Sequence, residues 1–303
     1  MTELAAGRSR ASRPRRSALR RRLPRIGTLL AACFMAAWVL VPFYFLFLLA
    51  IQSKADSLTT PPVWFPTPDL SNFTEILSHA FSDEPASRPS DLIFPGIVNS
   101  AVVATFVAVI NLLVGATAAY AFARYRFRGS QAIPVAMLGT QIVPIFALLV
   151  PYYVVFRNLG LTNSLAGIVV ADLSFTLPFT VWLLRGYVQG IPPDIDRQAR
   201  VDGCTRWGVF VRVILPLIRV GLLSVGLFAF LMSWNDFLFP LVLNSNEGSI
   251  MVQPAIAGLY NIREQSLGLM AAGTLLAAIP TLLIAVISQR FLVRGLLGGA
   301  TKQ

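Results

Sequence analysis

Residues 97–123 read IVNSAVVATFVAVINLLVGATAAYAFA, a stretch that holds no charged side chain. A helix needs about 20 apolar residues to cross the hydrocarbon core of a bilayer, so this stretch predicts one transmembrane helix. Five further stretches are comparably long and apolar: Ile26–Ile51, Ile133–Phe156, Leu165–Leu184, Leu215–Leu243 and Gly268–Ser288. None shows the alternating period of a membrane β-barrel strand. The sequence therefore predicts an all-α, polytopic membrane helical bundle with six transmembrane helices over residues 26–303.

The composition excludes several other classes of protein. Of 303 residues, 55% are hydrophobic and only 13% are charged, and the mean hydropathy is +0.68. These values exclude a disordered chain, a secreted disulfide scaffold and a typical cytosolic enzyme. Two cysteines (Cys33 and Cys204) and the single histidine, His79, leave almost no material for a metal cluster. We therefore expect no metal site and no catalytic residues.

The positive charge is distributed unevenly along the chain. The net charge is +11, and most of the 25 Lys and Arg residues fall on one side of the predicted membrane. They gather in residues 1–25, in the second and fourth loops and in the C-terminal tail. The positive-inside rule places both termini in the cytoplasm. The excess of positive charge is then explained by the orientation of the chain in the membrane, and it gives no support for nucleic-acid binding. Residues 1–25 are expected to form a disordered tail near anionic membrane lipid.

The cytoplasmic loop at residues 185–214 is polar between two strongly apolar spans. Pro192 and Pro193 should end the helix of the fourth span. Asp194 and Asp196 then favour a new helix N-terminus, and Asp202-Gly203 supplies a turn. A helix this short is marginal in water, so it should persist only when it packs against the bundle or a partner. The loop is thus a candidate contact surface for an intracellular protein.

The same loop resembles the conserved cytoplasmic loop of ABC-importer permeases. That family's pattern is Glu-Ala-Ala, three residues, Gly, nine residues, then Ile-x-Leu-Pro. Here Gly203 is followed by nine residues, then Val213, and Leu215-Pro216 closes the pattern. Arg197-Gln198-Ala199 replaces Glu-Ala-Ala, so the family's acidic contact with the ATPase does not carry over to Arg197. Either Asp194 or Asp196 compensates, or the cognate ATPase presents a different groove.

Further segments make the resemblance more specific, to the six-span partner in the permease pair of maltose-type sugar importers. They occur in order at the family's spacing: Trp64-Phe65-Pro66, Asn72-Phe73, Asn99-Ser100, residues 118–124, residues 159–164, Pro178-Phe179, residues 182–185, residues 234–238, Gln289-Arg290-Phe291 and residues 295–302. Each motif alone is weak, whereas the ordered set is specific.

The resemblance implies an uptake machine with the fold of a type I ABC importer in a bacterial cytoplasmic membrane. It implies a second permease subunit as heterodimer partner, a dimer of ATPase subunits, an extracytoplasmic solute-binding protein and a sugar substrate. The residues implied to couple to the ATPase are Asp196, Arg197, Gln198, Ala199, Asp202 and Gly203. This chain has no Gly-rich phosphate loop ending in Gly-Lys-Ser/Thr, so ATP and Mg are expected on the partner ATPase, with no cofactor on this chain.

Polar residues inside the spans are candidates for the translocation pathway. Asp172 lies about 10 Å into the fourth span by helical rise. A carboxylate at that depth needs either a wet cavity or a structural hydrogen bond. Asn111 and Gln141 either line the same cavity or join neighbouring helices. Asn235 and Asp236, near the outer end of the fifth span, are candidate substrate-side groups.

Three alternatives remain at this point. An ion-gradient-driven secondary transporter would show inverted repeats with broken helices at the midplane, and no clear repeat is present. A membrane-embedded enzyme needs a catalytic constellation that one His and two separated Cys do not build. An ABC-importer permease for a non-sugar solute, such as glycerol phosphate, fits the same motifs.

Overall fold

The computed structural model describes residues 19–53, 56, 59, 64–78, 86, 88–244, 246–260 and 267–300, and the side chains among them from residue 27 to 287 except Glu247. Helix α1 (Leu19–Ala50) begins inside the basic segment that was expected to be disordered through residue 25. The first 18 residues of that segment, His79 and residues 301–303 lie outside the described residues. The chain divides into two units, residues 1–47 and 48–303, and each is treated by itself.

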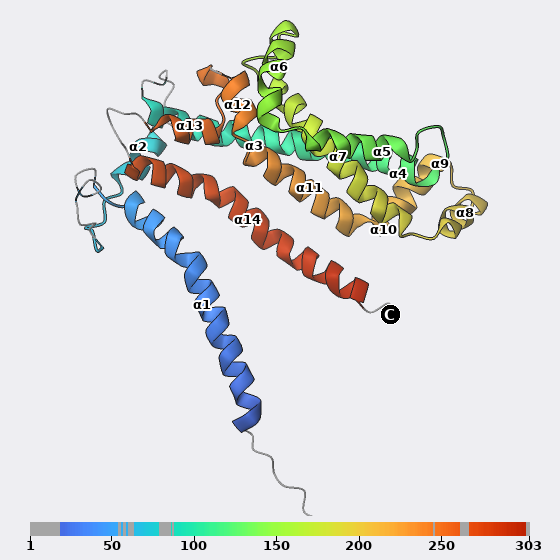
Figure 1. Cartoon of the computed structure of the whole chain (residues 1–303), viewed down its shortest axis with the longest axis horizontal. Helices are drawn as coiled ribbons and strands as arrows, with labels where there is room; N and C mark the ends of the chain where they lie inside the picture. Colours follow the sequence, from blue (N-terminus) through green and yellow to red (C-terminus); the bar gives the residue numbers. More distant parts are fainter. Residues whose placement is uncertain are drawn as a thin grey trace, which may run out of the picture. The chain divides into compact units, whose positions relative to one another are not determined.

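The described regular structure is helical (Figure 1). After α1 come α2 (Ser71–Ser78), η3 (Pro89–Leu92), α3 (Ile93–Ile110), η4 (Asn111–Gly115), α4 (Ala116–Arg124), α5 (Ala132–Gly139), η5 (Thr140–Ile142), α6 (Ile145–Asn158), α7 (Leu165–Gln189), α8 (Pro193–Val201), α9 (Arg206–Val209), η6 (Phe210–Ile214), α10 (Leu215–Leu217), α11 (Arg219–Trp234), α12 (Leu238–Leu243), η7 (Glu247–Ser249), α13 (Val252–Gly258) and α14 (Leu267–Ala300).

Four helical segments are long and apolar enough to cross a membrane. They are Gly27–Ala50, Pro89–Arg124, Leu165–Gln189 and Leu267–Ile287, and two bent helix pairs raise the number to six if each pair is one span. These segments coincide with the apolar stretches of the sequence. The predicted all-α membrane bundle is therefore confirmed, with up to six spans.

The third predicted span, residues 133–156, is not one continuous helix. Its two arms, Ala132–Ile142 and Ile145–Asn158, meet at an angle of 101°. Val143 is extended (φ −71°, ψ 124°), because the ring of a following proline excludes the helical region for the preceding residue. Pro144 is that proline, and the chain restarts as α6 directly after it. Apolarity alone did not indicate this bend.

The fifth predicted span, residues 215–243, is also divided. Arg206–Leu217 and Arg219–Trp234 meet at 80°, and Ile218 leaves the helical region at the bend (φ −92°, ψ 12°). Helix α11 then ends at Trp234, and α12 begins only at Leu238. The Asp236 carboxylate accepts a hydrogen bond from the Leu238 amide at 3.1 Å, which fixes the turn between them.

Helices α3, α7 and α11 pack against one another, and α4 packs against α7 (Figure 1). The contact between the second span and α7 is close because η4 ends in Gly115. A Cβ atom at that position would overlap the Thr180 methyl group. Near it, a buried cluster that includes Ala119, Leu184 and Val188 joins α4 and α7 to the segment after α8. This packing fixes how α7 lies relative to the second span.

We expect Gly115→Ala to destabilise the protein by about 1–3 kcal/mol, because the added methyl group forces α7 away from η4. The matched control is Gly186→Ala in α7, where a Cβ atom meets nothing within 4 Å and the substitution should be neutral or slightly stabilising. Thermal unfolding of both variants in detergent measures the difference. Equal melting temperatures for the two variants would contradict this account of the helix contact.

Candidate functional site

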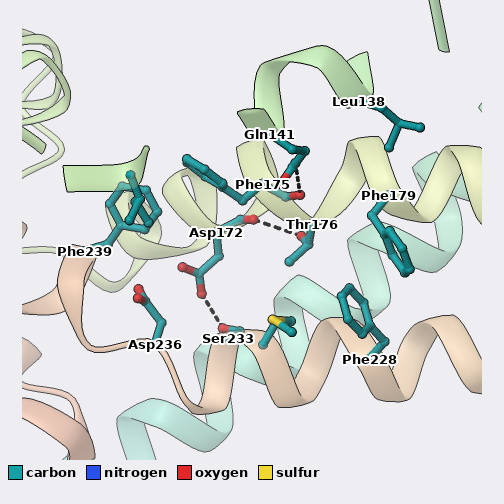
Figure 2. Close-up of a pocket in the computed structure, with 12 residues that line it drawn as sticks. Leu138, Gln141, Asp172, Phe175, Thr176, Phe179, Phe228, Ser233, Asp236 and Phe239 are labelled. Atoms are coloured by element: carbon teal, nitrogen blue, oxygen red, sulfur yellow. Dashed lines mark hydrogen bonds between the residues drawn. The ribbon is translucent and has the colours of Figure 1, made fainter. Parts of the chain in front are cut away.

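A cavity of about 430 Å³ lies between α7, α11 and the bent third span (Figure 2). Leu138, Gln141 and Ile145 reach it from either side of the bend. The polar members of its lining are Gln141, Asp172, Thr176, Ser233 and Asp236, and four phenylalanines supply much of the rest. The bent third span, helix α7 and the end of α11 thus surround one space.

One face of α7 forms a wall of the cavity. Asp172, Phe175, Thr176 and Phe179 all line it, and their spacing of three and four residues places them on one side of a helix. Of this set, only the charged residue, Asp172, was predicted from the sequence. The two phenylalanines and the threonine were missed, although the same spacing could have indicated them.

Two carboxyl groups lie next to each other in the cavity wall (Figure 2). Asp172 is only 4% exposed, and it accepts a hydrogen bond from the Ser233 hydroxyl group. Asp236 uses one oxygen to accept from the Leu238 amide, while its Oδ2 is buried without a hydrogen-bond partner. No Lys, Arg or His is among the described residues that line the cavity. The pair is therefore an acceptor-rich, acidic feature with no cation beside it.

Aromatic rings flank this acidic feature in two pairs. Phe179 and Phe228 lie with ring centroids 4.4 Å apart, and Phe175 and Phe239 lie 5.4 Å apart. Figure 2 shows the first pair on one side of the aspartates and the second pair on the other. The cavity thus combines apolar ring surface with a few polar groups, which is the usual composition of a small-molecule site.

Gln141 both lines the cavity and joins two helical segments. Its amide nitrogen donates a 2.7 Å hydrogen bond to the Phe175 carbonyl oxygen of α7. The sequence left these two roles as alternatives, and the structure shows both placements. The bend at Pro144 brings Gln141 to this position.

Asn111 belongs to a buried contact between helices and does not line the cavity. It is 0% exposed, its amide nitrogen donates to Thr176 Oγ1 at 2.8 Å, and its carbonyl oxygen accepts from the Thr180 hydroxyl group at 2.8 Å. Of the two roles open from the sequence, the geometry supports interhelical packing. A polar residue in a span indicates a need for partners but does not say which.

Asn235 lies apart from the cavity, in contrast to the expectation that it would share a substrate-side position with Asp236. It is exposed, and its amide nitrogen donates to the Leu231 carbonyl oxygen at 2.8 Å, which caps the end of α11. The two residues adjoin in sequence just after α11 ends at Trp234, but Asn235 bonds back to α11 while Asp236 accepts from the start of α12. Of this pair, only Asp236 lines the cavity.

A second candidate site is the polar segment around α8. Asp196, a predicted coupling residue, forms a partly buried ion pair with Arg124 of α4 at 2.9 Å, and Arg124 also donates to the Ile191 carbonyl oxygen at 3.0 Å. Ala199 is buried in the cluster at this end of the bundle. These two predicted residues therefore anchor α8 to the bundle, rather than presenting an outer surface.

The remaining predicted coupling residues are on the exposed side. Arg197, Gln198, Asp202 and Gly203 are all exposed, and Arg197 forms an ion pair with Asp194. Gly203 has φ +87°, and hydrogen bonds from Gly203 to Arg200 and from Cys204 to Ala199 close the end of α8. This is the glycine-dependent C-terminal motif of helices. The predicted turn at Gly203 therefore ends a short helix whose outer face is polar.

The bundle of long apolar helices, its internal cavity and the anchored polar helix define a multi-pass membrane transport protein. Residues 111–298 match the family described as "Binding-protein-dependent transport system inner membrane component". The chain belongs to this family. The identification as an ABC-importer permease, made from the loop motif, is thereby confirmed.

Individual relatives and a solved structure agree with the family. The chain is 32% identical over 261 residues to the diacetylchitobiose uptake system permease protein DasC of Streptomyces coelicolor, covering 86% of this chain and 91% of that protein. It is 29% identical to the trehalose/maltose transport system permease protein MalG of Thermococcus litoralis, covering 92% and 98%. Its fold is similar to a chain of a bacterial ABC transporter involved in the import of the acidic polysaccharide alginate (TM-score 0.73, 21% identity, 92% and 99% coverage).

We expect Asn111→Ala to lower the stability of the protein by about 1–3 kcal/mol, because it leaves the buried Thr180 hydroxyl group without its acceptor. Substrate preference should not change, since Asn111 lies outside the cavity lining. The control is Thr117→Ala, whose hydroxyl group bonds only carbonyl groups one turn earlier in the same span. Thermal unfolding and a transport assay with several solutes measure both effects. A changed solute preference in Asn111→Ala would show that this residue belongs to the pathway.

Proposed function

We propose that this chain is one of two permease subunits of an ATP-driven, binding-protein-dependent importer for a sugar or oligosaccharide. The observation that carries the proposal is the family match over residues 111–298, which spans both the cavity and α8. The two relatives described above are named for diacetylchitobiose and for trehalose/maltose. Ring surfaces beside hydrogen-bond acceptors also suit the apolar faces and hydroxyl groups of a saccharide.

The proposed complex contains a second permease subunit, a pair of ATPase subunits and an extracytoplasmic solute-binding protein. The ATPase subunits bind ATP and Mg, while this chain contributes half of the pathway and binds no nucleotide. Both termini and α8 lie on the cytoplasmic side. The concentration of Lys and Arg in the tails and in the segments next to α8 supports this orientation.

Within this complex, the exposed face of α8 contacts the ATPase. Arg197, Gln198 and Asp202 supply that face, and the ion pair between Asp196 and Arg124 fastens the helix to α4. Because this ion pair fastens α8 to α4, a movement of the ATPase that displaces α8 also displaces α4. Nucleotide binding then biases a rigid-body switch between two states of the pathway.

The cavity favours a sugar over glycerol phosphate as the transported solute. Phosphate recognition relies on Arg, Lys or clustered backbone amides. The described cavity lining has no basic side chain and has two carboxyl groups. A phosphate group would be repelled there, whereas a hydroxyl group would find acceptors.

The proposal is tested by purifying the chain from its native membrane and measuring ATP hydrolysis with and without the binding protein and a panel of sugars. We expect an ATPase and a second permease to co-purify, with hydrolysis stimulated by one sugar together with the binding protein. A chain that purifies alone and transports in liposomes without ATP would overturn the proposal in favour of gradient-driven transport.

We predict that Arg124→Gln weakens the stimulated ATPase activity of the complex by about tenfold and destabilises the α8 end by about 3 kcal/mol, because the partly buried Asp196 loses its cation. Exchange of the two charges in Arg124→Asp/Asp196→Arg should restore part of the activity. Arg126→Gln is the control, since it removes a charge from an exposed position nearby. Equal activity in Arg124→Gln and Arg126→Gln would contradict a coupling role for the ion pair.

A further inference from the structure

The acidic pair in the cavity offers hydrogen-bond acceptors that no basic side chain among the described lining residues faces. Buried carboxylates are costly unless cations or hydrogen-bond donors face them. Asp172 has the Ser233 hydroxyl group, but Asp236 Oδ2 is buried with no donor. Among the described residues of the lining, no basic side chain is available to either carboxyl group. A ligand in the cavity would therefore meet strong acceptors that need donors.

The chemistry of the ligand follows from this requirement. Hydroxyl groups donate hydrogen bonds to carboxylates, and a protonated amine does so with charge assistance. A ligand carboxylate would be placed against an acidic pair, with no basic side chain among the described lining residues, in a weakly screened site, which is unfavourable. The two phenylalanine pairs add apolar surface that suits the C–H faces of a sugar ring.

We infer that this cavity selects neutral and amino saccharides and excludes saccharides that carry carboxylates, with Asp172 and Asp236 as the selecting residues. The inference rests on the proposed function and adds a substrate class to it. It also separates this chain from the structurally similar importer, whose substrate is an acidic polysaccharide. On this inference, the two proteins share a fold but differ in the charge of the saccharide that they transport.

The test uses the purified complex without its binding protein, so that only the pathway can discriminate. Saturation-transfer NMR titrations compare three disaccharides with the same β-1,4 linkage, built from glucose, glucosamine or mannuronate. At a pH where the glucosamine is protonated, we expect the mannuronate disaccharide to bind at least about tenfold more weakly than the glucose disaccharide. The glucosamine disaccharide should bind more tightly than both.

Three variants assign this preference to the acidic pair. Asp236→Asn and Asp172→Asn should each bring the glucose and mannuronate disaccharides to within about threefold of one another. Asn235→Asp is the matched control, because it places a new carboxylate next to Asp236 but outside the cavity lining, and it should leave the preference unchanged. Gel filtration and thermal unfolding verify that each complex is assembled.

Equal binding of the glucose and mannuronate disaccharides by the wild-type complex would overturn the inference, as would a complex that binds none of the three. A preference that survives both Asp→Asn substitutions would overturn the assignment to these residues. The wild-type comparison decides the substrate class even where a variant fails to assemble. ATP-driven uptake in the presence of the binding protein tests the proposed function separately, since a sugar importer without this preference would fail only the inference.

Discussion

The hydrocarbon core of a bilayer offers no water to backbone amide and carbonyl groups, so each must find a partner within the protein. This constraint makes the apolar spans helical and limits where a helix can be interrupted. In unit 48–303 the interruption at Val143-Pro144 is flanked by Gln141 and Ile145, which line the cavity. The interruption after Trp234 carries Asp236, which lines it too. Two breaks in the helical pattern thus converge on one site.

The sequence predicted the parts of this structure that depend on composition and on short motifs. Long uncharged stretches indicated the spans, and Gly203 with Leu215-Pro216 indicated the polar loop and its family. The bend at Val143 was missed because apolarity is the same before and after it, whereas the cause is steric and local. The separate placement of Asn235 and Asp236 was missed for a similar reason. Their positions depend on where α11 ends, and this is set by the turn and its packing rather than by residue type.

Asp196 and Asp172, two acids of this unit, have opposite surroundings, and the contrast distinguishes a structural ion pair from a candidate ligand-binding group. Asp196 faces Arg124 at 2.9 Å, so the protein itself supplies its cation. Asp172 has one hydroxyl donor, and its neighbour is a second acid, Asp236, rather than a cation. An ion pair within the fold holds two segments together. An acidic pair without a cation leaves binding capacity for a molecule that comes from outside.

Helix α7 (Leu165–Gln189) connects these two sites. Asp172 and Phe179 lie in the cavity wall, while Leu184 and Val188, further along the same helix, pack in the cluster that holds Ala199 of α8. Between them, Thr176 and Thr180 bond Asn111, next to the close approach at Gly115. Packed and hydrogen-bonded groups therefore connect α8 to the cavity wall. For these contacts to couple the two sites, α7 must have two packing arrangements, and both α8 and the molecule in the cavity must favour one arrangement over the other. The bends of the third and fifth spans are the places where the rest of the bundle can adjust to either arrangement.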